Sequence, residues 1–115
     1  MIINIAKDFS RTPGARYKTE GKYSGEEFRE KILLPLISKA IEKDKKLTIV
    51  LDGTAGFSTS FLEEAFGGLF RSDFFKNSSL SLNDIMKHIF FISNEDKTYI
   101  DEIKLYMNDA FNYIF

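Results

Sequence analysis

The chain has 115 residues, the length of one compact domain, and its 43% hydrophobic and 15% aromatic content is sufficient for a hydrophobic core. Its 16 basic and 17 acidic side chains give a formal net charge of -1, so overall electrostatics does not favour nucleic acid or an anionic membrane as partner. The chain has no cysteine, which excludes disulfides, thiolate metal sites and thiol catalysis. It also lacks an apolar run of the roughly 20 residues that a membrane span needs and a signal-peptide pattern, so we expect a single cytoplasmic domain over residues 1–115.

The first part of the chain predicts a β-hairpin. Ile2 to Phe9 alternates weakly between apolar and polar residues, as an edge strand does, and Thr12-Pro13-Gly14 has the composition of a turn. Arg16 to Tyr23 alternates again and is predicted to be the second strand. Its basic residues and tyrosines resemble a strip that binds nucleic acid, but such clusters are usually solvated faces, and we expect no nucleic acid partner.

A first helix is predicted from Gly25 to Lys43. Ser24 and Glu27 have the spacing of a capping box, which satisfies backbone N–H groups of the first helical turn. Pro35 falls within the apolar periodicity of this helix, where proline lacks an N–H and clashes with the carbonyl of Lys31. We therefore expect either a kink or a break at Pro35.

A central strand is predicted from Leu47 to Leu51. The segment is nearly all apolar and rich in β-branched residues, which is typical of a strand covered on both faces. Asp52, Gly53 and Gly56 then predict a turn, because Asp bonds to nearby backbone and Gly tolerates positive φ.

A second helix is predicted to begin near Phe61. Ser60 and Glu63 have the spacing of another capping box. Gly67 and Gly68 weaken this helix intrinsically by about 1 kcal/mol each relative to Ala. We therefore expect another backbone to approach the helix closely at these glycines.

The last third of the chain predicts a loop, a strand and a final helix. Phe74 to Ser81 reads as a loop, Leu82 to Lys87 as one helical turn, and His88 to Ile92 as a short buried strand. Ser93 or Asn94 is expected to cap the last helix. The apolar face of that helix consists of Tyr99, Ile100, Ile103, Met107, Ala110, Phe111 and Ile114.

This order of elements predicts a small α/β sandwich. Strands separated by helices call for a mixed, mostly parallel sheet with right-handed crossovers, and the N-terminal hairpin would supply its one antiparallel pair. The layout resembles the STAS domain, the fold of bacterial anti-sigma factor antagonists. Four pieces of sequence are similar to the STAS-like family of small uncharacterised proteins, a former domain of unknown function. They are Asp8-Phe9-Ser10, Pro13-Gly14 with Arg16-Tyr17, Ser24 to Phe28, and Ser60 to Gly67.

The resemblance implies a switchable binding module and not an enzyme. Antagonists of the STAS type bind an anti-sigma factor with a histidine-kinase-like ATPase fold, which phosphorylates a Ser or Thr at the start of the helix after the central strand. Their motif is Asp-Ser-Ser-Gly or Asp-Ser-Thr-Gly, whereas this chain has Phe57 to Leu62, which lacks the Asp. The register is therefore open, and the candidate phosphoacceptors are Ser60, Thr59 and Ser58.

The residues around this turn are also the expected binding surface. A phosphate at a helix N-terminus is stabilised by free N–H groups and the helix dipole, so binding could be switched without unfolding. The alternative is a small-molecule or anion sensor that binds at the Thr54 to Ser60 turn. The residues expected to contact a partner are Asp52, Thr54, Phe57, Phe61 and Glu64.

Catalysis, cofactors and metals have little support in the sequence. Asp52, Glu63 and Glu64 could in principle form an acid–base cluster, but capping and the helix dipole account for the two glutamates. The loop from Gly53 to Thr59 lacks the Gly-Lys-Ser/Thr ending of a phosphate-binding loop. His88 is the only histidine and has no acidic companion at metal-ligand spacing, so we expect it to be structural.

Overall fold

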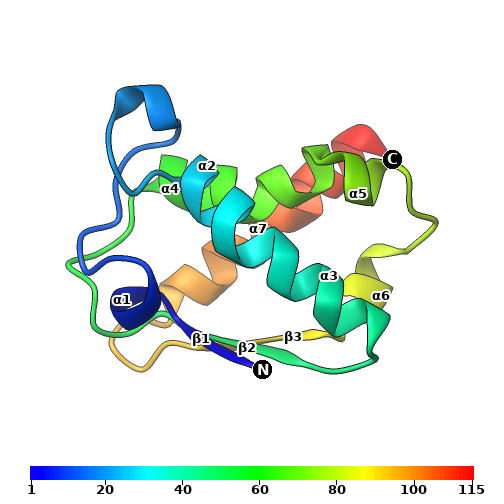
Figure 1. The fold of residues 1–115 in the computed structure, drawn as a ribbon, viewed down its shortest axis with the longest axis horizontal. Helices are drawn as coiled ribbons and strands as arrows, with labels where there is room; N and C mark the ends of the chain where they lie inside the picture. The colour runs from blue at the N-terminus through cyan, green and yellow to red at the C-terminus, as the bar shows by residue number, and fades with distance from the viewer.

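A three-stranded parallel sheet forms one layer of the structure, and the helices form the other (Figure 1). The computed structural model describes residues 1–115. In chain order the elements are β1 (Ile2–Asn4), α1 (Ile5–Asp8), the 3-10 turn η1 (Lys18–Glu20), α2 (Gly25–Phe28), the π-helical turn η2 (Arg29–Leu33), α3 (Leu34–Glu42), β2 (Leu47–Val50), α4 (Thr59–Phe66), the 3-10 turn η3 (Gly67–Arg71), α5 (Asp73–Lys76), α6 (Leu82–Met86), β3 (Ile89–Ile92) and α7 (Thr98–Ile114).

The strands lie side by side in the order β1-β2-β3, and this order places all the helices on one face of the sheet. Both connections step across the sheet in the same direction, and right-handed crossovers then bring their helices to the same side. Figure 1 shows the helices on that side only. The predicted mixed α/β class and the central position of the Leu47 strand are confirmed.

The predicted N-terminal hairpin is wrong, because Arg16 to Tyr23 forms no strand. Strand β1 is only three residues long, and its neighbour is β2. Two backbone carbonyls of this segment instead accept hydrogen bonds from the first amides of α2. The Ala15 carbonyl accepts from the Gly25 amide (2.9 Å), and the Arg16 carbonyl accepts from the Glu26 amide (3.0 Å). These carbonyls are therefore not available for a β-ladder.

Pro35 neither breaks nor ends the first helix, which runs from residue 25 to 42 through η2. The Leu34 amide donates to the carbonyl of Arg29, five residues back, so the turn before the proline is widened into a π turn. This wider turn accommodates the missing N–H of Pro35 and the bulk of its ring. At the start of the helix the Ser24 hydroxyl caps the Glu27 amide (3.0 Å), as predicted, whereas the Glu27 carboxylate bonds to the Tyr23 amide instead of completing a capping box.

Alternate residues of the sheet point into the core. Ile3, Ile49 and Phe91 are buried against the helices. The prediction that the central strand is covered on both faces is wrong, because Thr48 and Val50 on the other face are only half-buried and no helix lies over them. An apolar sequence such as that of β2 is compatible both with a strand covered on two faces and with a strand covered on one.

The last third follows the prediction with three differences. The strand predicted to be buried, β3, has one side covered only, because Phe90 is 57% exposed and Ile92 is half-buried. A four-residue helix, α5, lies within the segment predicted as a loop. Helix α7 begins at Thr98, later than predicted, where the Asp96 carboxylate accepts a hydrogen bond from the Thr98 amide (3.0 Å). Its predicted apolar face does lie against the core. None of the helices combines the length and apolar character of a membrane span, and no group of acidic or histidine side chains is arranged to hold a metal.

Helices α2 and α4 approach each other closely at Gly25. A Cβ atom at this position would lie 2.5 Å from the backbone oxygen of Phe61 and 3.2 Å from the backbone nitrogen of Ala65. Both are backbone atoms of α4, which cannot move away as the end of a flexible side chain can. The absence of a side chain at Gly25 therefore sets the spacing of the two helices.

Replacing Gly25 with Ala is expected to destabilise the protein by about 1–3 kcal/mol, because overpacking forces the helices apart. Urea unfolding followed by circular dichroism measures this change. The exposed Asn108→Ala variant on α7 is the control and is expected to change stability by less than about 0.5 kcal/mol. A G25A variant as stable as the wild type would contradict the close packing of α2 and α4.

Candidate functional site

The candidate site lies at the N-terminus of α4, which follows the central strand β2 through the loop of residues 51–58. Ser58 is the N-cap, and its hydroxyl accepts a hydrogen bond from the Phe61 amide (3.0 Å). The predicted capping box of Ser60 with Glu63 is therefore wrong, and the helix begins two residues before Phe61. Ser58, Thr59 and Ser60 are all residue types that can cap a helix. Contacts with the rest of the fold decide which of them is the N-cap.

The three candidate phosphoacceptors are accessible but differ in their contacts. Ser58 and Thr59 are exposed and Ser60 is half-buried. The Ser58 hydroxyl is engaged, because it caps the helix and also lies 3.4 Å from the carbonyl oxygen of Gly14. The hydroxyls of Thr59 and Ser60 have no hydrogen-bond partner, and neither do their backbone N–H groups. An anionic group at this place would therefore meet free donors at the positive end of the helix.

A shallow depression of about 420 Å³ adjoins these hydroxyls. One wall is the start of α4, and the other is the 14–17 segment, which carries Arg16. The residues that line it are Gly14, Ala15, Arg16, Tyr17, Glu20, Ser58 and Ser60. The Thr54 to Phe57 part of the turn, expected to form the sensor site, does not line it.

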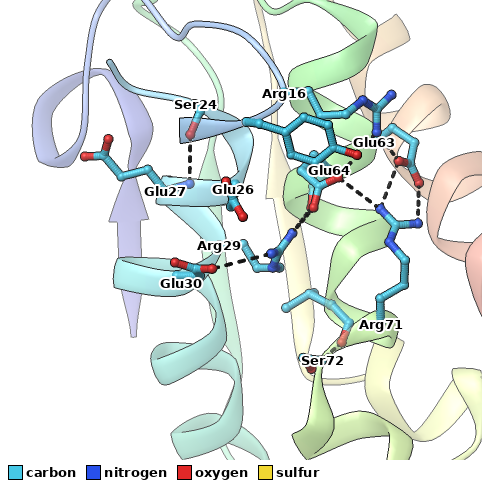
Figure 2. A network of polar contacts seen from close by, with 12 residues as sticks. Arg16, Ser24, Glu26, Glu27, Arg29, Glu30, Glu63, Glu64, Arg71 and Ser72 are labelled. Atoms are coloured by element: carbon cyan, nitrogen blue, oxygen red, sulfur yellow. Dashed lines mark hydrogen bonds and ion pairs between the residues drawn. The ribbon is translucent and has the colours of Figure 1, made fainter. Parts of the chain in front are cut away.

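A network of ion pairs joins this depression to the interior (Figure 2). Glu63 on α4 is bound by Arg16 (2.5 Å) and by both terminal nitrogens of Arg71 (2.9 and 3.0 Å). Glu64 on the same helix is paired with Arg29, and its other oxygen lies 3.4 Å from Arg16 and from Arg71. Arg29 also donates to the backbone carbonyl of Glu64 (2.8 Å). The network therefore ties the first helix, α4, η3 and the 14–17 segment together.

Glu63 is held in the ionised form by its arginine partners. Burial alone would raise the pKa of Glu63, but hydrogen bonds from Arg71 and Arg16 outweigh it and lower the pKa. The hydrogen bond to Glu63 raises the pKa of Arg71 in turn. Glu64 is the more deeply buried of the two, with 8% of its side chain exposed, and Arg29 beside it has 13% exposed.

Two glycines at the end of α4 make room for this network. A Cβ atom at Gly68 would collide with the guanidinium of Arg29, and one at Gly67 would lie 2.5 Å from a carboxylate oxygen of Glu63 and 3.3 Å from the backbone oxygen of Tyr106. The predicted approach of a backbone is thus present at Gly67, and a charged side chain occupies the space at Gly68.

The residues expected to contact a partner fall into two groups. Asp52 joins two loops, because its carboxylate accepts hydrogen bonds from the amides of Asn94 (2.8 Å) and Glu95 (2.9 Å). The Thr54 hydroxyl accepts from the Gly56 amide (3.2 Å) within the turn. Both side chains therefore support the loop, and both remain partly accessible.

The apolar and acidic members of that set are more deeply placed. Phe61 is fully buried and Glu64 is 6% exposed, so neither side chain can reach a partner while the fold is intact. Phe57 is half-buried, and its ring packs edge-on against Tyr99 with ring centroids 5.1 Å apart. The sequence did not indicate that Arg16, Arg29 and Arg71 pair with these glutamates, and the partners of Arg16 and Arg29 lie 47 and 35 residues away in the chain.

His88 is buried at the opposite end of the strands. Its Nδ1 lies 2.8 Å from the carbonyl oxygen of Lys45, which anchors the start of β3 beside the start of β2. This contact agrees with the structural role expected for the only histidine.

Removing Glu64 alone is expected to cost about 3–5 kcal/mol, because the nearly buried Arg29 would lose its closest carboxylate and keep only the longer contact with Glu30 (3.9 Å). The double variant Glu64→Leu with Arg29→Leu should recover much of this loss. Urea unfolding gives the coupling energy of the pair when it is measured for the wild type, for Glu64→Leu, for Arg29→Leu and for the double variant. Additive losses would contradict a direct pair.

The pairing of Glu63 predicts a loss of stability in acid. Its pKa is lower in the folded than in the unfolded state, so its contribution is present above the ordinary value of 4.5 and disappears as the pH falls through the folded pKa. At pH 7 Glu63→Gln should destabilise the protein by about 1–2 kcal/mol. The free energy of unfolding, measured for both proteins between about pH 7 and pH 3, should differ less between E63Q and the wild type as the pH falls. Glu42→Gln is the exposed control, and a gap between E63Q and wild type that persists unchanged at low pH would oppose the assignment.

Comparison with known proteins bears on this site. A family model described as a STAS-like domain of unknown function matches residues 24–97, which include β2, α4 and the hydroxyl residues at its start. No curated protein and no solved structure matches the chain. The match covers well over half of the sequence and agrees with the α/β fold described above. The chain therefore belongs to the family of STAS-like domains of unknown function.

Proposed function

We propose that the protein is a cytoplasmic, non-catalytic interaction module whose binding is switched by phosphorylation of Ser60 by a histidine-kinase-like ATPase partner. The observation that carries this proposal is the placement of an unbonded hydroxyl at the start of the helix that follows the central strand, beside an arginine. This is the position that the phosphorylated residue occupies in anti-sigma factor antagonists, which the STAS-like family resembles.

Ser60 suits this role better than its neighbours. The Ser58 hydroxyl already caps α4, so its modification would remove a hydrogen bond that the helix uses. Thr59 is free and exposed, and it is the second candidate. Only Ser60 shares the depression with Arg16 among the unbonded hydroxyls. A phosphate there adds about −1.5 to −2 charges beside a cation and free amides, so the surface changes while the helix stays folded.

The acidic residues of the site support a non-catalytic role. Asp52 holds loop amides, and Glu63 and Glu64 hold arginines. A general acid at neutral pH needs a raised pKa, and that of Glu63 is lowered. The arrangement therefore favours a docking surface over acid–base chemistry.

Anion sensing remains a second candidate function, favoured by one observation. The depression combines Arg16 with the positive end of α4, which is a chemistry that holds carboxylate or phosphate groups. The anion site would lie between the 14–17 segment and the start of α4, and not at the Thr54 to Ser60 turn expected from the sequence. Titration with inorganic phosphate followed by NMR would support sensing if the Arg16 and Ser60 signals saturate together.

Phosphorylation is tested by incubating the protein with the histidine-kinase-like ATPase encoded nearest to its gene and with ATP. Mass spectrometry should locate phosphate on Ser60, and Ser60→Ala should reduce incorporation at least about tenfold, since phosphoryl transfer needs the positioned hydroxyl. Thr59→Ala and Ser58→Ala are the matched controls. Incorporation that Ser60→Ala leaves unchanged, or none with an ATPase that binds the protein, would overturn the proposal.

A further inference from the structure

The face of the sheet that points away from the helices is uncovered. Its residues form two rows across the strands, because Thr48 pairs with Ile2 and Phe90, and Val50 pairs with Asn4 and Ile92. We call these six residues the open face. They are Ile2, Asn4, Thr48, Val50, Phe90 and Ile92.

Large apolar side chains of the open face are in contact with solvent. Ile2 is 74% exposed and Phe90 is 57% exposed, and both lie in one row of the sheet. All-parallel sheets are almost always covered on both faces, because their side chains are apolar on both sides. The open face therefore has the character of an unfilled interface.

Charge differs between the two ends of the open face. Since the strands are parallel, all of them begin at one edge and end at the other. Positive charges predominate where the strands begin and negative charges predominate where they end. The beginning has Lys45, Lys46 and Lys87 against Asp44 and Asp84, of which Asp84 lies 3.9 Å from Lys87, and the end has Asp8, Asp52, Glu95 and Asp96 against Lys7 and Lys97.

We propose that the open face binds a second copy of this chain, with the two sheets face to face and their strands antiparallel. A two-fold axis between the sheets and perpendicular to the strands places the basic end of one copy over the acidic end of the other. The same axis places Phe90 over Ile92 of the second copy, and Ile92 over its Phe90. A two-fold axis along the strands would instead put like charges together. The charge distribution therefore selects the antiparallel arrangement.

The size of the open face sets the strength of this dimer. Three strands spaced by about 4.8 Å with about 3.3 Å per residue give a patch of roughly 14 by 13 Å. This is well below the ~800 Å² per partner of a standard interface, so the charged strand ends must contribute to the contact. The dimer is accordingly weak and sensitive to salt. This inference does not depend on phosphorylation at α4.

Sedimentation equilibrium of the wild-type chain up to about 1 mM tests the dimer. Phe90→Asp should raise the Kd at least about tenfold, because it replaces a large exposed apolar side chain of the contact with a charge. Tyr113→Asp, at a side chain that is 92% exposed on α7, is the matched control and should leave the Kd unchanged. Since F90D could alter the strand, concentration-dependent NMR shifts of the wild type, largest at Ile2 and Phe90, provide a second measurement.

The antiparallel arrangement is tested by charge. Raising NaCl from about 0.05 M to about 0.5 M should raise the Kd several-fold, and Lys46→Glu should do so at low salt while Lys104→Glu on α7 should not. A chain that stays monomeric at about 1 mM, or a dimer that F90D leaves intact, overturns the proposal. A dimer that salt strengthens would overturn the antiparallel arrangement.

Discussion

The buried pair of Glu64 with Arg29 connects most of the structure. Arg29 lies at the start of the π turn that Pro35 imposes on the first helix, and its guanidinium fits only because Gly68 has no side chain. A buried ion pair adds little net stability compared with apolar residues of similar size, but it strongly penalises any packing that separates its members. The pair therefore acts mainly as a constraint on how the first helix and α4 fit together, and the rest of the network extends that constraint to Arg16.

The connection between this constraint and the proposed switch is the position of Arg16. Its guanidinium is paired with Glu63 on α4, while its backbone carbonyl accepts a hydrogen bond from the Glu26 amide at the N-terminus of α2. The 14–17 segment is thus held on α4 by the ion pair of Arg16 with Glu63 and on the start of α2 by main-chain hydrogen bonds. A new negative charge near Ser60 would compete with Glu63 for the same cation, so a modification of the surface has a direct route to the interior.

The one-sided sheet is a consequence of chain topology. With strand order β1-β2-β3, right-handed connections bring every helix to one face, and no reversal of direction supplies a layer on the other. A short parallel sheet of this kind leaves apolar side chains such as Phe90 in water. Parallel strands also collect the charges of their preceding and following loops at opposite edges. Topology therefore leaves one face of the sheet exposed and separates the two sets of loops, while the sequence of those loops sets the sign of the charge at each end.

The sequence by itself determined the elements whose signals are local. The periodicity of the first and last helices, the apolar strands at Leu47 and Ile89, and the hydroxyl-rich start of α4 each depend on residues within one turn or a few residues of one another. Tertiary structure decided the rest: the loss of the predicted hairpin, the cap at Ser58 instead of Ser60, the burial of Phe61, and the arginines around Glu63 and Glu64. These features depend on groups that are far apart in the chain, such as Arg16 and Glu63. Their energies favour one arrangement only after the backbone has brought them together.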